Sequence, residues 1–130
     1  MIVDDSLVIR VRLKKIFKEL NHNVIAEAKT GKEAIEIYSK KIPDIVTMDI
    51  TMPDMDGITA VKYIKNKYPD AKIIMVTSHG QENMVRDALI SGARGYILKP
   101  IQKVKLKESL NKIFHGLEDE TELTEDFFND

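Results

Sequence analysis

The sequence contains no cysteine. This absence excludes disulfide bonds, thiolate metal sites and a cysteine nucleophile, and it suits a reducing compartment. Long hydrophobic runs are missing as well. Strongly apolar stretches such as 73–76 are far shorter than the roughly 20 residues that a membrane-spanning helix needs. No positively charged leader followed by an apolar segment precedes the first acidic residues, so no signal peptide is indicated. We therefore expect a cytoplasmic protein with no membrane partner.

What is present is an ordinary globular composition with an uneven distribution of charge. The chain has 130 residues, 43% hydrophobic and 32% charged, which is enough for a single domain. All 20 lysines and arginines lie before residue 116, whereas residues 116–130 carry seven acidic residues and no basic one. We predict a globular domain over residues 1–115 and an acidic, solvated C-terminal tail or linker over residues 116–130.

Short apolar segments alternate with helical patterns along the first 115 residues. The pattern predicts strands over 1–3, 24–28, 45–48, 72–77 and 95–98, and helices over 6–20, 32–40, 58–67, 81–91 and 104–115. Strands that alternate with helices favour an α/β fold with a parallel sheet covered on both faces. The strands are continuous apolar runs rather than strict alternations, which is typical of strands buried on both sides.

Two helix starts carry capping residues. Ser6 can cap the first helix, and Thr30 with Glu33 three residues later forms a capping box for the second. The apolar positions of the first helix are Val8, Val11, Leu13, Ile16, Phe17 and Leu20. In the second helix we expect Ala34, Ile35 and Tyr38 to face inward.

Polar residues follow four of the five predicted strands. Asp4 and Asp5 follow the first, Asp49 the third, Thr77 the fourth and Lys99 the fifth. Right-handed crossovers place all these loops at one edge of the sheet, where open α/β sheets bind their ligands. Taken singly, each residue has an ordinary structural explanation, such as helix capping by an Asp pair. Their joint placement favours a functional site.

The chemistry of this set is coherent. Three carboxylates in one crevice repel one another and raise each other's pKa, and a hard divalent cation relieves that repulsion. Mg²⁺ prefers a few carboxylates together with water and phosphate oxygens. Lys99 and Thr77 supply a positive charge and a hydroxyl for a multiply charged anion such as phosphate.

Four segments carry a family resemblance. They are IVDDS at 2–6, DIVTMDITMPDMDG at 44–57, IIMVTS at 73–78 and SGARGYILKP at 91–100. With their spacing, they resemble the receiver domain of two-component response regulators, in particular the chemotaxis type, over essentially residues 1–115. The resemblance implies a (βα)5 doubly wound, flavodoxin-like parallel sheet of five strands in the order 2-1-3-4-5.

The resemblance also implies roles for individual residues. Asp49 resembles the phosphoacceptor, and Lys99 the lysine that contacts the phosphoryl oxygens. Asp5 resembles a direct Mg²⁺ ligand, Asp4 a ligand that acts partly through water, and Thr51 the residue whose backbone carbonyl is a further ligand.

Other residues match the switch of the family. Thr77 resembles the switch hydroxyl, and Tyr96 the aromatic residue that turns inward on activation. Lys99–Pro100 resembles the cis peptide of the family. Thr51 and His79 stand at positions that the family varies to tune the phosphoryl lifetime, although a surface position is the preferred interpretation for His79, as it is for the other two histidines, His22 and His115.

We therefore expect a stand-alone phosphoacceptor switch of the chemotaxis type rather than an enzyme. It would accept a phosphoryl group on Asp49 from a histidine kinase, with Mg²⁺, and bind a downstream protein through the fourth helix, fifth strand and fifth helix. No direct nucleic-acid contact is expected, because the lysines are spread over several helices. The alternative is a receiver domain cut from a longer regulator with a DNA-binding or enzymatic output.

Two further alternatives are weaker. A phosphohydrolase with an aspartyl nucleophile needs a second aspartate two residues later, where this chain has Thr51. A degenerate, unphosphorylated receiver is disfavoured by the complete set of acidic, hydroxyl and lysine residues. The first strand is only three residues long where the family usually has more, which we interpret as a shifted start or an N-terminus set by cloning.

Overall fold

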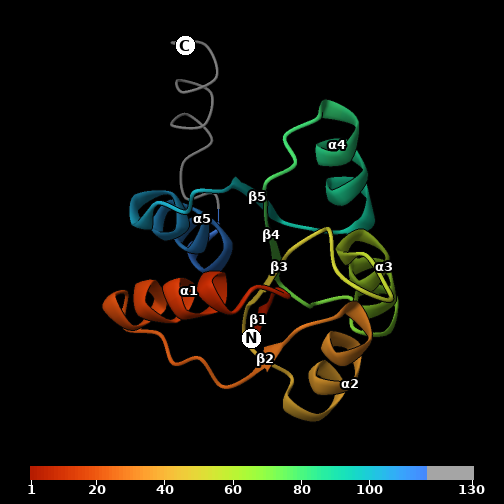
Figure 1. The fold of residues 1–130 in the computed structure, drawn as a ribbon, viewed down its shortest axis with the longest axis horizontal. Coiled ribbons are helices and arrows are strands. Elements are labelled where there is room, and N and C mark those ends of the chain that lie inside the picture. The colour runs from red at the N-terminus through yellow and green to blue at the C-terminus, as the bar shows by residue number, and fades with distance from the viewer. Residues whose placement is uncertain (117–130) are drawn as a thin grey trace.

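Strands and helices alternate throughout the computed structural model, which describes residues 1–116 (Figure 1). The predicted tail beyond Gly116 lies outside the described residues. The strands are β1 (Ile2–Val3), β2 (Glu27–Ala28), β3 (Val46–Met48), β4 (Ile73–Thr77) and β5 (Gly95–Leu98). The helices are α1 (Leu7–Glu19), α2 (Gly31–Lys41), α3 (Gly57–Lys67), α4 (Glu82–Ser91) and α5 (Lys103–His115).

The five strands form one parallel sheet in the order β2-β1-β3-β4-β5, which confirms the predicted fold and strand order. Val3 pairs with Met48, Met48 with Met75 and Met75 with Tyr96. The register therefore places the carboxyl ends of the strands in one row, and the loops that follow them meet at the same edge.

Helices cover both faces of this sheet. Figure 1 shows α1 and α5 on one side and α2, α3 and α4 on the other. Each side has its own apolar core. The larger side chains of the α1–α5 core include Leu13, Phe17, Leu106 and Leu110, and the opposite core includes Tyr38, Val61, Ile64 and Met75. All residues of β1, β3 and β4 are buried, which explains why these strands are apolar runs.

The second strand is shorter than the predicted 24–28. Only Glu27 and Ala28 pair with a neighbour, because β2 lies at the edge of the sheet and its single neighbour, β1, offers just Ile2 and Val3. The remaining predicted boundaries agree with the structure to within one residue. The length of β2 is therefore set by the number of residues that β1 offers for pairing, and not by the length of the predicted segment 24–28.

The apolar positions of α1 are only partly buried. Val8 and Val11 are 75% and 53% exposed, whereas Arg10 is 6% exposed. Leu13, which is buried, comes three residues after Arg10, so the buried stripe of the helix runs through the arginine and not through the two valines. An apolar residue count cannot foresee this, because a charged residue occupies a core-facing position.

Both predicted caps are present. The Oγ of Ser6 accepts a hydrogen bond from the backbone N–H of Ile9, and the Oγ1 of Thr30 accepts one from the N–H of Glu33. Both bonds satisfy otherwise unpaired donors at the first turn of a helix. Within residues 1–116, no helix combines the length and apolar character required to cross a membrane.

Candidate functional site

Three carboxylates meet at the edge of the sheet where the strands end. One oxygen from each of Asp4, Asp5 and Asp49 lies within 4.8 Å of the others. Asp4 and Asp49 are buried, and Asp5 is exposed. Since β1 and β3 are neighbours in the sheet, the two loops that follow them bring these residues together as predicted. Oxygen ligands at this spacing are the donor set that a hard divalent cation such as Mg²⁺ prefers.

Asp4 is held in place through each of its polar atoms. Its N–H donates to the carbonyl of Ala28 in β2, and its carbonyl accepts from Nη1 of Arg10 at 2.8 Å. One carboxylate oxygen accepts from the backbone N–H of Ser6 at 2.9 Å, and the other from Nζ of Lys99 at 2.8 Å. The side chain is thereby fixed by contacts from the start of α1 and from the segment after β5.

Asp49 is a buried carboxylate with an unusual electrostatic setting. Its Oδ1 accepts a hydrogen bond from the N–H of Ile50 at 2.8 Å, and its Oδ2 lies 3.4 Å from Nζ of Lys99. Burial raises the pKa of Asp49, and the negative charge of Asp4 raises it further, while Lys99 and the Ile50 N–H act in the opposite direction. The net effect is a carboxyl group that gives up its proton less readily than an exposed aspartate.

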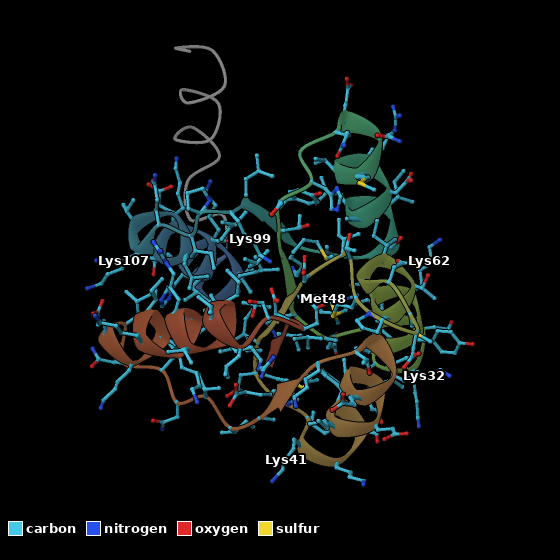
Figure 2. The ribbon with its side chains drawn as sticks, viewed as in Figure 1. Lys32, Lys41, Met48, Lys62, Lys99 and Lys107 are labelled. Atoms are coloured by element: carbon cyan, nitrogen blue, oxygen red, sulfur yellow. The ribbon has the colours of Figure 1, made fainter. Side chains whose placement is uncertain are left out.

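Lys99 is the cation of the site. Its ammonium group forms ion pairs with Asp4 and Asp49, and its side chain is largely buried. Burial lowers the pKa of Lys99, but the hydrogen bonds and charges of the two aspartates outweigh this effect and leave the pKa raised. The Lys99–Pro100 peptide bond is cis, as the resemblance implied. Figure 2 shows Lys99 beside β5, on the side of the sheet that faces α5.

His79 connects the predicted switch residues, which sequence reasoning did not foresee. Its N–H donates to Oγ1 of the fully buried Thr77 at 3.3 Å, and its carbonyl accepts from the hydroxyl of Tyr96. Its ring Nε2 lies 2.7 Å from Oγ1 of Thr51. His79 is half-buried and makes these three contacts, so it is more than a surface residue. Of the other two histidines, His22 is also half-buried, whereas His115 is exposed as expected.

Gly57 is a second residue whose importance the sequence did not reveal. It begins α3, and a Cβ built at this position would lie 1.8 Å from the backbone oxygen of Asp49. Its N–H donates to the carbonyl of Ile50 at 2.8 Å. Only glycine allows the start of α3 to approach the backbone of Asp49 this closely. The sequence feature that could have pointed to this glycine is its place at the end of the DMDG motif at 54–57.

Four other lysines lie on different sides of the molecule. Figure 2 shows Lys32, Lys41, Lys62 and Lys107 pointing outward from α2, α3 and α5, on different sides of the molecule. Lys99 differs from these residues because it points toward the carboxylates. These four positions are typical of solvated surface lysines.

Comparison with known proteins places this arrangement in a family. The family model for the response regulator receiver domain matches residues 1–111. The chemotaxis protein CheY of Bacillus subtilis is 47% identical over 112 residues, which cover 86% of this chain and 93% of that protein. The CheY of Thermotoga maritima is 47% identical over 113 residues, covering 87% of this chain and 94% of that protein.

A solved structure agrees with these sequence matches. It is the complex of CheX, CheY, BeF3 and Mg²⁺ from Borrelia burgdorferi, with a TM-score of 0.84 and 41% sequence identity. The match covers 87% of this chain and 86% of that one. The chain described here therefore belongs to the response regulator receiver domain family of two-component systems, whose members are switches, and it is CheY-like.

Proposed function

We propose that the chain is a chemotaxis-type regulator that acts in the cytoplasm and accepts a phosphoryl group on Asp49 from a phosphohistidine of a histidine kinase, in a reaction that requires Mg²⁺. The observation that carries this proposal is the meeting of three carboxylate oxygens within 4.8 Å, with the ammonium group of Lys99 beside two of them. The domain would comprise residues 1–115, with 116–130 as an acidic tail or linker.

The residues present fit Mg²⁺. Asp5, Asp49 and the backbone carbonyl of Thr51 would hold the ion, and Asp4 would contribute partly through water. All are hard oxygen donors, and a related CheY was solved with Mg²⁺. When bound, the ion neutralises charge on the transferring phosphoryl group and orients it for in-line attack.

The chain itself supplies the nucleophile. A carboxylate oxygen of Asp49 attacks phosphorus, the new O–P bond forms as the N–P bond of the phosphohistidine breaks, and the electron pair of that bond returns to the imidazole nitrogen. The N–H of Ile50 and the ammonium group of Lys99 hold the carboxylate in place before the reaction. Lys99 can then pair with the phosphoryl oxygens, because its ammonium group already lies beside Oδ2 of Asp49.

The switch follows from hydrogen bonding at Thr77. In the described part of the chain, its hydroxyl accepts a hydrogen bond from the N–H of His79 but donates to no group. The hydroxyl proton is therefore available to a new phosphoryl oxygen. Movement of Thr77 toward that oxygen would release the N–H of His79, and the hydroxyl of Tyr96 is bound to the carbonyl of the same histidine. The change at Asp49 would thus alter the surface around β5.

A groove beside β5 is the proposed binding surface for the downstream protein. It has a volume of about 620 Å³ and lies between β5 and α5. Its walls include Tyr96 and Leu98 from β5 and Lys105 and Lys112 from α5. Because Tyr96 contributes to both the groove and the contact with His79, rearrangement of the switch would change the shape of the groove.

The proposal is tested by phosphorylation with acetyl phosphate, read by intact mass. We expect one phosphoryl group per chain in the presence of Mg²⁺, and none when a chelator is present or when the chain carries Asp49→Asn. Asp54→Asn is the matched control, because Asp54 is an exposed aspartate of the same loop with a positive φ that asparagine tolerates. Phosphorylation that persists in Asp49→Asn would disprove the assignment.

A further inference from the structure

A buried arginine supports the carboxylate cluster from behind. Arg10 lies on α1 and is only 6% exposed, which is rare for an arginine unless its charge is paired. Its Nη1 donates to the carbonyl oxygen of Asp4 at 2.8 Å, and its Nε donates to the carboxylate of Glu27 at 3.2 Å. The guanidinium group therefore joins α1, the edge strand β2 and the backbone between the two aspartates.

The side-chain direction of Asp5 depends on the hydrogen bond from Arg10 more than that of Asp4 does. The side chain of Asp4 is held by Ser6 and Lys99, whereas within residues 1–116 the exposed carboxylate of Asp5 has no hydrogen bond or ion pair. Its direction is set by the backbone. The carbonyl of Asp4 and the N–H of Asp5 belong to the same planar peptide group, so the bond from Arg10 fixes the plane from which Asp5 projects.

We propose that Arg10 is a positioning residue for Mg²⁺ binding. It holds the Asp4–Asp5 peptide so that the unsupported carboxylate of Asp5 faces Asp49. This inference rests on the proposed function, because it concerns the same metal site. Groups that orient metal ligands from behind commonly change metal affinity by about 10- to 100-fold when they are removed.

The sign of the effect separates positioning from simple electrostatics. A guanidinium cation close to the site repels Mg²⁺, so its removal would tighten metal binding if charge alone mattered. If Arg10 orients Asp5, its removal weakens binding. The two explanations therefore predict changes in opposite directions.

Two variants test separately the two contacts of the guanidinium group, with the carbonyl of Asp4 and with the carboxylate of Glu27. In Arg10→Gln, the side-chain amide ends at the position of Nε, so it can still donate to Glu27 but cannot reach the carbonyl of Asp4. Glu27→Gln removes the charge of the ion pair with Arg10 and leaves the contact with Asp4 intact. Ile16→Val is a mild truncation of a buried residue on the same helix and controls for loss of stability alone.

The experiment is calorimetric titration of the full chain with MgCl₂, after a thermal melt without metal has shown that each variant is folded. We expect Arg10→Gln to bind Mg²⁺ at least about tenfold more weakly than the unaltered chain, and Glu27→Gln and Ile16→Val to stay within about threefold of it. Should Arg10→Gln not fold, Arg10→Met replaces it, because methionine buries no unpaired amide.

Equal or tighter binding by the Arg10 variant would overturn the proposal, and so would an equal loss in Glu27→Gln or Ile16→Val. Asp5→Ala, which removes a proposed ligand, serves as the blank. If the unaltered chain binds no more Mg²⁺ than Asp5→Ala, the metal site of the proposed function fails and the role of Arg10 fails with it. If the unaltered chain binds and only the Arg10 comparison fails, the proposed function stands.

Discussion

At the scale of single residues, two buried threonines in neighbouring strands differ in one respect. Thr47 in β3 and Thr77 in β4 are 1% and 0% exposed. The hydroxyl of Thr77 accepts a hydrogen bond from His79, whereas the hydroxyl of Thr47 has no partner among the described residues. A buried hydroxyl without a partner is destabilising, so the two positions should respond in opposite ways to the same substitution.

We expect Thr47→Val to raise the free energy of unfolding by about 1 kcal/mol, because valine has nearly the same shape and buries no unpaired group. Thr77→Val should lower it by about 1 kcal/mol, because the N–H of His79 loses its acceptor. Urea denaturation followed by circular dichroism measures both changes. A loss of stability in Thr47→Val would show that its hydroxyl has a partner after all.

The raised pKa of Asp49 leads to a prediction on pH. Because the folded chain binds this proton more readily than the unfolded chain, the native state holds more protons above about pH 4, the ordinary range of aspartate. The contribution of Asp49 to stability therefore falls as the pH rises through its folded pKa. Its slope is at most about 1.4 kcal/mol per pH unit, the limit for one proton.

Asp49→Asn has no such titration. We expect its stability relative to the unaltered chain to increase between pH 4 and pH 7, in urea denaturation carried out with a chelator. Asp54→Asn should show a constant difference over the same range. A constant difference for Asp49→Asn as well would mean that the pKa of Asp49 is the same in the folded and unfolded chain.

The sequence alone predicts that four residues of the candidate site lie close together. Asp4, Asp5, Asp49 and Lys99 stand directly after predicted strands, and parallel pairing brings them together. Arg10 was missed for a physical reason. A charged residue on a helix is normally solvated, and Arg10 is buried because its guanidinium group bonds to the carbonyl of Asp4 and to the carboxylate of Glu27.

At the scale of elements, the close approach of the start of α3 to the backbone of Asp49 constrains the β3–α3 loop. Gly57→Ala would place a methyl group against the backbone oxygen of Asp49, at a distance that requires the backbone to move. We expect a loss of about 1–3 kcal/mol in the free energy of unfolding, the usual cost of overpacking, together with slower phosphorylation of Asp49 by acetyl phosphate.

Gly80→Ala is the control for this substitution. A Cβ at Gly80 would meet only the end of the Leu98 side chain, at 3.2 Å, and that side chain is half exposed and can move. We expect its effect on stability to be well under that of Gly57→Ala. Similar losses in the two variants would show that the loop before α3 is adaptable, contrary to the close contact described above.

Element boundaries could be predicted where capping residues and prolines mark them, as at Ser6 and Thr30. The boundaries could not be predicted where pairing with a neighbouring strand sets the length of the strand. The segment 24–28 begins with the strand-forming residues Val24 and Ile25, but β1 offers only two residues for pairing. The inward face of α1 likewise depends on how the helix is rotated against the sheet, which its apolar residues alone did not define.

At the scale of the whole molecule, metal binding should couple to folding. The carboxylates come from loops after β1 and β3 and approach one another only in the native state, so Mg²⁺ should stabilise that state by mass action. We expect the melting temperature to rise with MgCl₂, corresponding to about 2.7 kcal/mol at a concentration one hundred times the dissociation constant.

Asp5→Ala should abolish this rise, whereas Asp54→Ala should retain it. Differential scanning calorimetry at constant ionic strength measures the shift and avoids a general salt effect. An equal rise in Asp5→Ala would place the stabilising ion at another part of the chain.

The overall topology shows the limit of pattern reasoning at this scale. Alternation of strands and helices predicts a parallel sheet with helices on both faces, but it does not order the strands. The order β2-β1-β3-β4-β5 was expected from the four motif segments and is confirmed by the pairing. Periodicity reports which face of an element is buried, whereas strand order depends on contacts between segments far apart in the chain.

The double ion pair of Lys99 has a consequence for a cell in which free Mg²⁺ fluctuates. With the ammonium group between Asp4 and Asp49, repulsion at the sheet edge is already partly relieved without any metal. We therefore expect the domain to stay folded when the ion is removed, unlike a zinc finger, which unfolds when its metal is removed. When magnesium is scarce, the unphosphorylated protein would keep its fold and would still bind any partner that recognises the unphosphorylated form. If phosphorylation of Asp49 requires Mg²⁺ as proposed, scarcity of the ion would stop phosphorylation while the amount of folded protein stays unchanged.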